Sequence, residues 1–124
     1  MIVLDTSVLI DSLTGPKRSA LSLRAMIERG ERILLPTLVL YEWLRGPRLP
    51  GEIAAQEALF PSDNAIPFGP REAALSAQLY RGLRRARGRE IDIAIAAVAI
   101  LRDAGLWTLN TADFACIRNL RLIP

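Results

Sequence analysis

The chain has 124 residues, of which 51% are hydrophobic and 23% charged, a composition that excludes a disordered protein and allows one domain with a buried core. It has no His and one Cys, which excludes Ser-His-Asp and Cys-His catalysis, His-ligated zinc and an internal disulfide. Sixteen basic residues against thirteen acidic ones give a net charge of +3. All the basic residues except Lys17 are Arg, the side chain best suited to bidentate phosphate binding.

The sequence carries no membrane or export signal. No apolar stretch reaches the roughly 18 to 20 residues that span a bilayer, and Met1 leads directly into a predicted strand without a basic leader. A lone cysteine fits a reducing compartment. We therefore expect a cytoplasmic protein with a single domain over 1–124 and no membrane contact.

The first eleven residues predict a strand, a turn and a helix. The apolar run Ile2-Val-Leu4 is typical of a strand buried on both faces, and Val8-Leu-Ile10 begins the helix. Asp5 lies between them, with Thr6 and Ser7 after it. Ligands of open α/β sheets bind beyond the carboxyl ends of the strands, which is where Asp5 is expected. The alternative is that Asp5 only caps the helix that follows.

A helix over 18–29 and a short buried strand over 32–35, stopped by Pro36, complete a right-handed parallel crossover. The next predicted helix, over 38–45 with Thr37 as its cap, contains Glu42 among large apolar side chains. Because burying a carboxylate without a partner is costly, Glu42 either pairs with Arg45 at i+3 or belongs to a site.

The middle of the chain predicts a helix over 51–60, a brief strand around 65–68 and a long helix over 70–87 that Gly88 ends. Pro67 restricts the strand to an edge, and Gly82 weakens the long helix by about 1 kcal/mol relative to Ala. The end of this helix and the residues after it form a basic cluster that is dense enough to attract a polyanion, although a solvated helix face is the alternative. The cluster consists of Arg81, Arg84, Arg85, Arg87 and Arg89.

The helix over 91–101 is apolar except for Asp92, which predicts a helix buried all round. Asp92 lies in its first turn, where the helix dipole favours an anion by about 0.3–1 kcal/mol. That is less than the several kcal/mol of desolvation, so a divalent cation is a better partner. A buried strand over 106–109 then ends in a polar cluster with Asn110, Thr111 and Asp113, where Asp113 is either a helix cap or a site residue. A final short strand is expected at 122–123.

Four acids therefore lie in unusual settings: Asp5, Glu42, Asp92 and Asp113. In a right-handed α/β sheet, strand ends and the starts of neighbouring helices share one edge, so these carboxylates are expected to converge there. Four carboxylates without His or Cys make an all-oxygen site, which favours Mg²⁺ or Mn²⁺ over zinc.

Taken in order, these segments resemble the motifs of PIN-domain nucleases. Ile2-Val-Leu-Asp5-Thr-Ser is similar to the opening motif, and Tyr41-Glu42 through Gly46 to the second. Ile91-Asp92 followed by Ile95-Ala-Ala97 is similar to the third, and Leu109-Asn-Thr111 with Asp113-Phe114 to the fourth. Length and spacing match the small VapC-type toxins of toxin–antitoxin pairs.

The resemblance implies a three-layer α/β/α sandwich with a mostly parallel sheet of about five strands, and a Mg²⁺- or Mn²⁺-dependent endoribonuclease. The four acids would hold one or two metal ions, and Thr6, Ser7, Asn110 and Thr111 would support them or contact phosphate. The Arg81–Arg89 cluster would bind the RNA backbone.

Relatives of this type are usually inhibited by a small antitoxin and commonly form homodimers or larger toxin–antitoxin assemblies. The resemblance therefore also implies a cognate antitoxin as partner. The apolar side chains of residues 38–60 either contact that partner or pack the core, and they are Trp43, Leu44, Leu49, Ile53 and Phe60.

Two other functions compete with the ribonuclease. A PIN-like module could bind RNA or protein without cutting, which the four acids argue against. A Mg²⁺-dependent phosphatase would need an Asp-x-Asp pair after the first strand, and Asp5-Thr-Ser7 lacks the second Asp.

Overall fold

The structure is a computed structural model that describes residues 1–124. Its four strands are β1 (Ile2–Leu4), β2 (Ile33–Leu34), β3 (Gly105–Trp107) and β4 (Arg121–Leu122). Its helices are α1 (Thr6–Leu13), α2 (Ala20–Glu28), α3 (Thr37–Arg45), α4 (Pro50–Leu59), α5 (Pro70–Gly82), α6 (Glu90–Leu101) and α7 (Thr111–Phe114), with a 3₁₀ turn, η1, at Ser62–Asn64.

The strands form one parallel sheet in the order β2-β1-β3-β4. Strand β1 is central, with Val3 opposite Leu34 of β2 and Leu106 of β3. Val3, Leu4 and Leu106 are fully buried, as the continuous apolar run of β1 predicts. The α/β class and the parallel crossovers are therefore confirmed.

The sheet has four strands where about five were expected. Residues 65–68 do not form a strand and contribute only an isolated parallel bridge between Pro36 and Ile66. The Ile66 N–H donates to the Leu35 carbonyl, and Thr37 N–H donates to the Ile66 carbonyl, both at 2.8 Å. The ladder does not continue, because α3 begins at Thr37 on one side of the bridge and η1 ends at Asn64 on the other.

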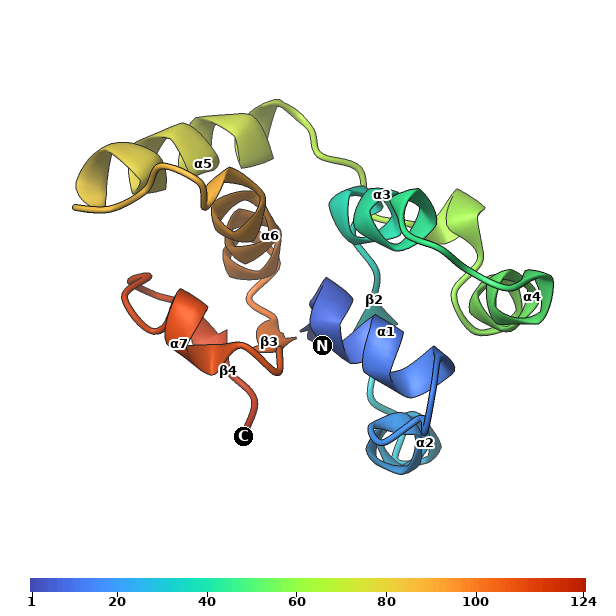
Figure 1. The fold of residues 1–124 in the computed structure, drawn as a ribbon. Coiled ribbons are helices and arrows are strands. Elements are labelled where there is room, and N and C mark those ends of the chain that lie inside the picture. The colour runs from blue at the N-terminus through green and yellow to red at the C-terminus, as the bar shows by residue number, and fades with distance from the viewer.

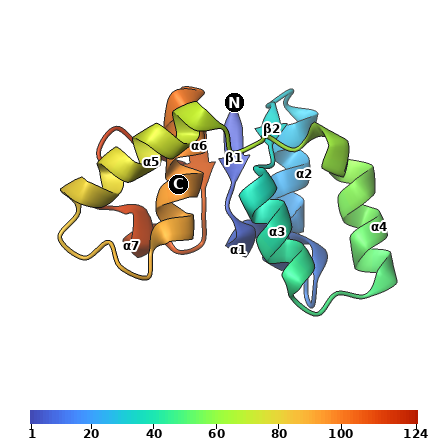
Figure 2. The same cartoon turned by 90° about the horizontal axis from the view of Figure 1, so that it is seen from above.

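Helices cover both faces of the sheet and separate into two groups. In Figure 1, α3 and α6 lie on one side of the strands and α2 on the other. Figure 2 shows α1 to α4 on one side of β1 and α5 to α7 on the opposite side. This is the three-layer α/β/α arrangement, and it places the start of α1 between the two groups.

Helix α6 lies at the centre of the molecule. All seven residues from Ile93 to Ala99 are buried, which confirms the helix that the sequence predicts to be buried all round. None of the helices is both long enough and apolar enough to cross a membrane.

Most predicted boundaries agree with the structure within one or two residues, but the long helix is shorter than expected. Helix α5 ends at Gly82 and not at Arg87, and Leu83 has an extended backbone (φ −96°, ψ 138°). Glycine stabilises a helix less than any other residue except proline, so the helix ends where its propensity is lowest. Residues 84–89 consequently form a loop before α6.

Candidate active site at the carboxyl edge of the sheet

Asp5 lies directly after the central strand and is buried, with 4% of its surface exposed. Its N–H donates to the Trp107 carbonyl, which continues the pairing of β1 with β3. Although Asp5 occupies the N-cap position of α1, its side chain makes no capping hydrogen bond. The capping alternative is therefore wrong, and the carboxylate has a different role.

Two hydroxyl groups hold one oxygen of this carboxylate. Ser7 Oγ donates to Asp5 Oδ2 at 2.9 Å, and Thr108 Oγ1 donates to the same atom at 2.7 Å. Each hydroxyl also accepts a backbone N–H at 3.0 Å, from Leu109 and Asn110 respectively. Because these N–H groups occupy hydroxyl lone pairs, both hydroxyl protons are directed at Oδ2. No side-chain hydrogen bond reaches Oδ1, which stays available for a ligand.

Thr108 is a site residue that the sequence interpretation missed, because the pattern places it only within the buried strand over 106–109. A signal was nevertheless present. A hydroxyl-bearing residue at the end of an apolar strand is buried here to 4% exposure and needs a hydrogen-bond partner.

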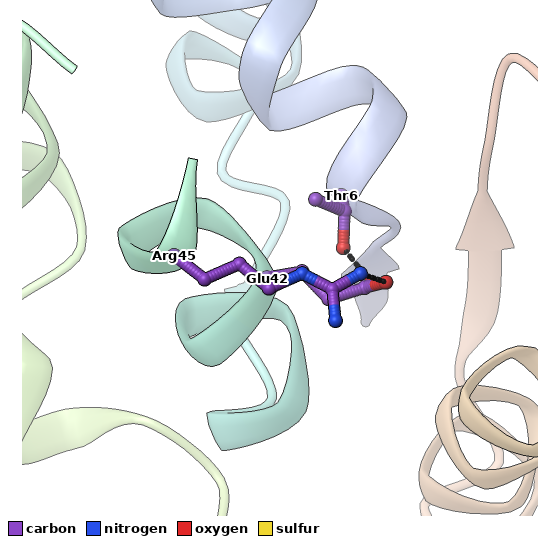
Figure 3. Close-up of polar contacts among 3 residues, drawn as sticks. All are labelled: Thr6, Glu42 and Arg45. Carbon is purple, nitrogen blue, oxygen red and sulfur yellow. Dashed lines mark hydrogen bonds and ion pairs between the residues drawn. The ribbon is translucent and has the colours of Figure 1, made fainter. Parts of the chain in front are cut away.

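Glu42 on α3 faces the start of α1 (Figure 3). Thr6 Oγ1 donates to Glu42 Oε1 at 2.5 Å, and Arg45 Nη2 contacts Oε2 at 3.2 Å. The ion pair at i+3 is thus present. The Thr6 hydrogen bond additionally joins Glu42 to the turn that carries Asp5, so the same side chain points into the site and is partly neutralised.

Asp92 is the third residue of α6, and its carboxylate makes no hydrogen bond or ion pair. Partial burial raises its pKa from 3.8 to about 6, and the negative charges of Asp5, Asp113 and Glu42 contribute in that order. Arg89 acts in the opposite direction. All three other candidate acids therefore lie near enough to repel Asp92.

Asp113 is exposed in the first turn of α7, where Asn110 occupies the N-cap position, so the capping alternative is wrong for Asp113 as well. Asn110 and Thr111 are exposed too. Asn110 reaches the site through its backbone N–H to Thr108, and Thr111 is the first residue of α7.

Comparison with known protein families identifies the domain. Residues 2–118 match the model of the PIN domain. The chain belongs to the PIN-domain family.

This PIN domain is similar along its whole length to individual relatives. It is 33% identical to Ribonuclease VapC19 of Mycobacterium tuberculosis over 128 aligned positions, covering 98% of both chains. Among solved structures, a DNA-bound VapBC complex from Salmonella typhimurium contains a chain 20% identical, with a TM-score of 0.81 and coverage of 98% of this chain and 96% of that one. VapBC2 from Rickettsia felis, bound to a promoter fragment, gives 21% identity, a TM-score of 0.75 and coverage of 99% and 98%. These two likenesses concern the fold.

The oxygen atoms that this PIN domain offers at the site are of the kind that bind a hard divalent cation. The site offers only carboxylate and hydroxyl oxygens, and its acids lack enough positive charge to offset their mutual repulsion. As the side chains stand, no three acidic groups lie close enough together to form a ready metal site. Carboxylates that repel one another are expected to lie apart in this way, and after burial this repulsion is the second cause of the raised pKa of Asp92.

The structure divides the predicted basic cluster. Four of its members are exposed on α5 and the loop before α6, namely Arg81, Arg84, Arg85 and Arg87. Arg89 is different, because it is partly buried, donates through Nη1 to Cys116 Sγ at 3.4 Å and feels the charges of Asp113 and Asp92. It therefore belongs to the edge of the acidic site.

Proposed function

We propose that this PIN domain is a Mg²⁺- or Mn²⁺-dependent endoribonuclease and the toxin of a toxin–antitoxin pair. The observation that carries the proposal is the gathering of acids at the carboxyl edge of the sheet, where burial and the charges of Asp5, Asp113 and Glu42 raise the pKa of Asp92. Uncompensated carboxylates of this kind call for a cation. The 33% identity to a protein named as a ribonuclease supports RNA as the substrate.

Asp5, Glu42, Asp92 and Asp113 would hold the cation, directly or through water. When bound, the cation polarises the attacking water and the phosphate and stabilises charge on the leaving oxygen. Ser7 and Thr108 hold Asp5 Oδ2 and so present Oδ1 to the site. Thr6 holds Glu42 Oε1 against the turn that carries Asp5. Such supporting hydrogen bonds orient the groups around a metal.

The exposed arginines of the cluster would bind the RNA backbone, and Arg89 would meet phosphate at the edge of the site. Phosphate contacts of this kind supply affinity and orientation and carry no sequence information. Asn110 and Thr111, which are exposed at the start of α7, would contact the same strand.

A small antitoxin and a second copy of the chain are the proposed protein partners, since the neighbours in fold are complexes titled VapBC. The apolar set of residues 38–60 must be divided, however. Trp43 and Phe60 are buried and pack the core, so they are wrong as partner contacts. Leu44 and Leu49 are exposed by 50% and 67% and remain available.

The test is digestion of unstructured RNA by the purified chain with Mg²⁺ and with EDTA. We expect cleavage only with the metal, and its loss in Asp5→Asn and Asp92→Asn, which remove one negative charge each. Asp63→Asn makes the same change on exposed η1 and is expected to cut normally. Growth inhibition on expression should follow the same pattern.

A folded wild-type protein that binds RNA but never cuts it with either metal would favour the non-catalytic module. Full cleavage by Asp5→Asn would remove the proposed mechanism.

A further inference from the structure

A hollow between α5 and α6 has no role in the proposed chemistry. Its volume is about 430 Å³, and it lies where the two helices pack side by side in both views (Figures 1 and 2). Two aromatic side chains line it, Phe68 and Tyr80, which are 38% and 39% exposed. An open, apolar hollow with two partly exposed rings is a suitable platform for another flat ring.

Polar groups surround these rings. Arg81 and Glu90 line the hollow. Ser76 Oγ also lines it and is buried without a hydrogen-bond partner. A buried hydroxyl that lacks a partner is costly, so a ligand that hydrogen-bonds to it is favoured.

A second, basic hollow of about 560 Å³ adjoins the first, because Tyr80 and Arg81 line both. Its remaining walls include three more arginines, and none of the four makes an ion pair with a carboxylate. A flat apolar platform beside unpaired guanidinium groups matches the two parts of a nucleotide, a base and a phosphate.

We propose that this pair of hollows is a second contact site for single-stranded RNA, in which a base stacks on Tyr80 while the neighbouring phosphates bind Arg81 and the loop arginines. The inference rests on the proposed ribonuclease function for the identity of the polyanion.

The distance between the hollow and the acidic site sets the length of RNA that can reach both. Glu90 and Asp92 are both in the first turn of α6, and two residues correspond to roughly 200° around the helix. The hollow is therefore on the opposite side of α6 from the acidic site, about one helix diameter, or roughly 10 Å, away. An RNA strand that crosses the start of α6 reaches both sites with a few unpaired nucleotides.

A second copy of this chain is the competing occupant of an apolar hollow. In a two-fold dimer the same surface of both chains forms the interface. A dimer through this hollow would therefore bring the unpaired arginines of the two chains close to one another. Like charges at an interface oppose association, whereas a polyanion neutralises them. The charge of the loop thus favours RNA.

The test is binding of a fluorescein-labelled, unstructured RNA in EDTA, measured by fluorescence anisotropy, so that no cleavage occurs. Tyr80→Leu should weaken binding of an RNA long enough to reach both sites by about fivefold or more. Tyr80→Phe keeps the ring and should bind like wild type. Arg81→Gln should weaken binding, whereas Arg18→Gln, an exposed arginine between α1 and α2, should not.

Stacking is also measured directly with 2-aminopurine in the RNA, whose fluorescence should be quenched by wild type and Tyr80→Phe but not by Tyr80→Leu. Equal binding of the long RNA by wild type and a folded Tyr80→Leu variant would overturn the inference. So would a dimer that dissociates in Tyr80→Leu in sedimentation experiments. Absence of cleavage in Mg²⁺ would overturn the ribonuclease proposal and would leave these binding results intact.

Discussion

Replacing Asp92 by asparagine should make the metal-free protein more stable at neutral pH while removing its activity. The folded protein raises the pKa of Asp92 from 3.8 to about 6, so ionising this group costs free energy in the folded state. Between these values the folded chain binds more protons than the unfolded chain. Stability therefore falls as the pH rises from about 4 to 6, and the full cost is present above that range.

The expected gain in unfolding free energy follows from the size of the pKa shift of Asp92. For a fully buried group it would correspond to about 3 kcal/mol, and solvent screening of this partly buried carboxylate reduces it to about 1–2 kcal/mol. For a chain of this length, that corresponds to a rise in melting temperature of about 4–8 °C. An asparagine side chain has nearly the same shape as an aspartate without the charge, so the packing of α6 should not change.

The assay is thermal unfolding followed by circular dichroism in EDTA at pH 7.5 and pH 4. Asp92→Asn should melt higher than wild type at pH 7.5 and equally at pH 4, where the folded wild type is already protonated. Adding Mg²⁺ should stabilise wild type by mass action and have little effect on the variant. Asp63→Asn controls for the change in net charge. Equal melting of wild type and Asp92→Asn at pH 7.5 would refute the argument that burial and the neighbouring acids raise the pKa of Asp92.

Three other changes test separate parts of the structure. Thr108→Val removes one hydrogen bond to Asp5 at nearly constant side-chain shape. A Mg²⁺ titration of activity should show a cleavage rate or a Mg²⁺ affinity that is lower by about 10–100-fold. An unchanged titration would show that Asp5 does not need this hydrogen bond. Replacing Arg84, Arg85 and Arg87 together by Gln should change the salt dependence of RNA binding, measured by fluorescence anisotropy. The slope of the logarithm of the binding constant against the logarithm of the salt concentration should become shallower by roughly 2. An unchanged slope in the triple variant would mean that the loop does not contact RNA. Ile95→Ala should cost about 2–5 kcal/mol of unfolding free energy in urea, because its side chain is fully buried in α6, and a loss below 1 kcal/mol would contradict the central position of that helix.

The sequence was sufficient where one physical effect dominates. The apolar run of β1 and the apolar helix α6 follow directly from burial, since a segment without a polar face has to be inside. The unusual settings of two acids, which the sequence displays, are present in the structure as well. Asp5 is buried without capping α1, and Asp92 lies on a buried helix without a partner.

The sequence-based predictions failed where local propensity and tertiary contacts nearly balance. Gly82 weakens the long helix, but whether the helix passes a glycine depends on tertiary contacts that the sequence does not display. Residues 65–68 have strand-like side chains, but η1 ends at Asn64 and α3 begins at Thr37, which leaves room for one bridge only. Thr108 was missed because a single hydroxyl in an apolar strand acquires its meaning only from Asp5, which is 103 residues away.

That separation has a consequence for the growing polypeptide. The carboxylate near the amino terminus acquires its Thr108 hydrogen bond and its backbone pairing with Trp107 only after the last fifth of the chain has joined the sheet. A chain still being translated therefore lacks these contacts to Asp5 until the ribosome has nearly completed its synthesis.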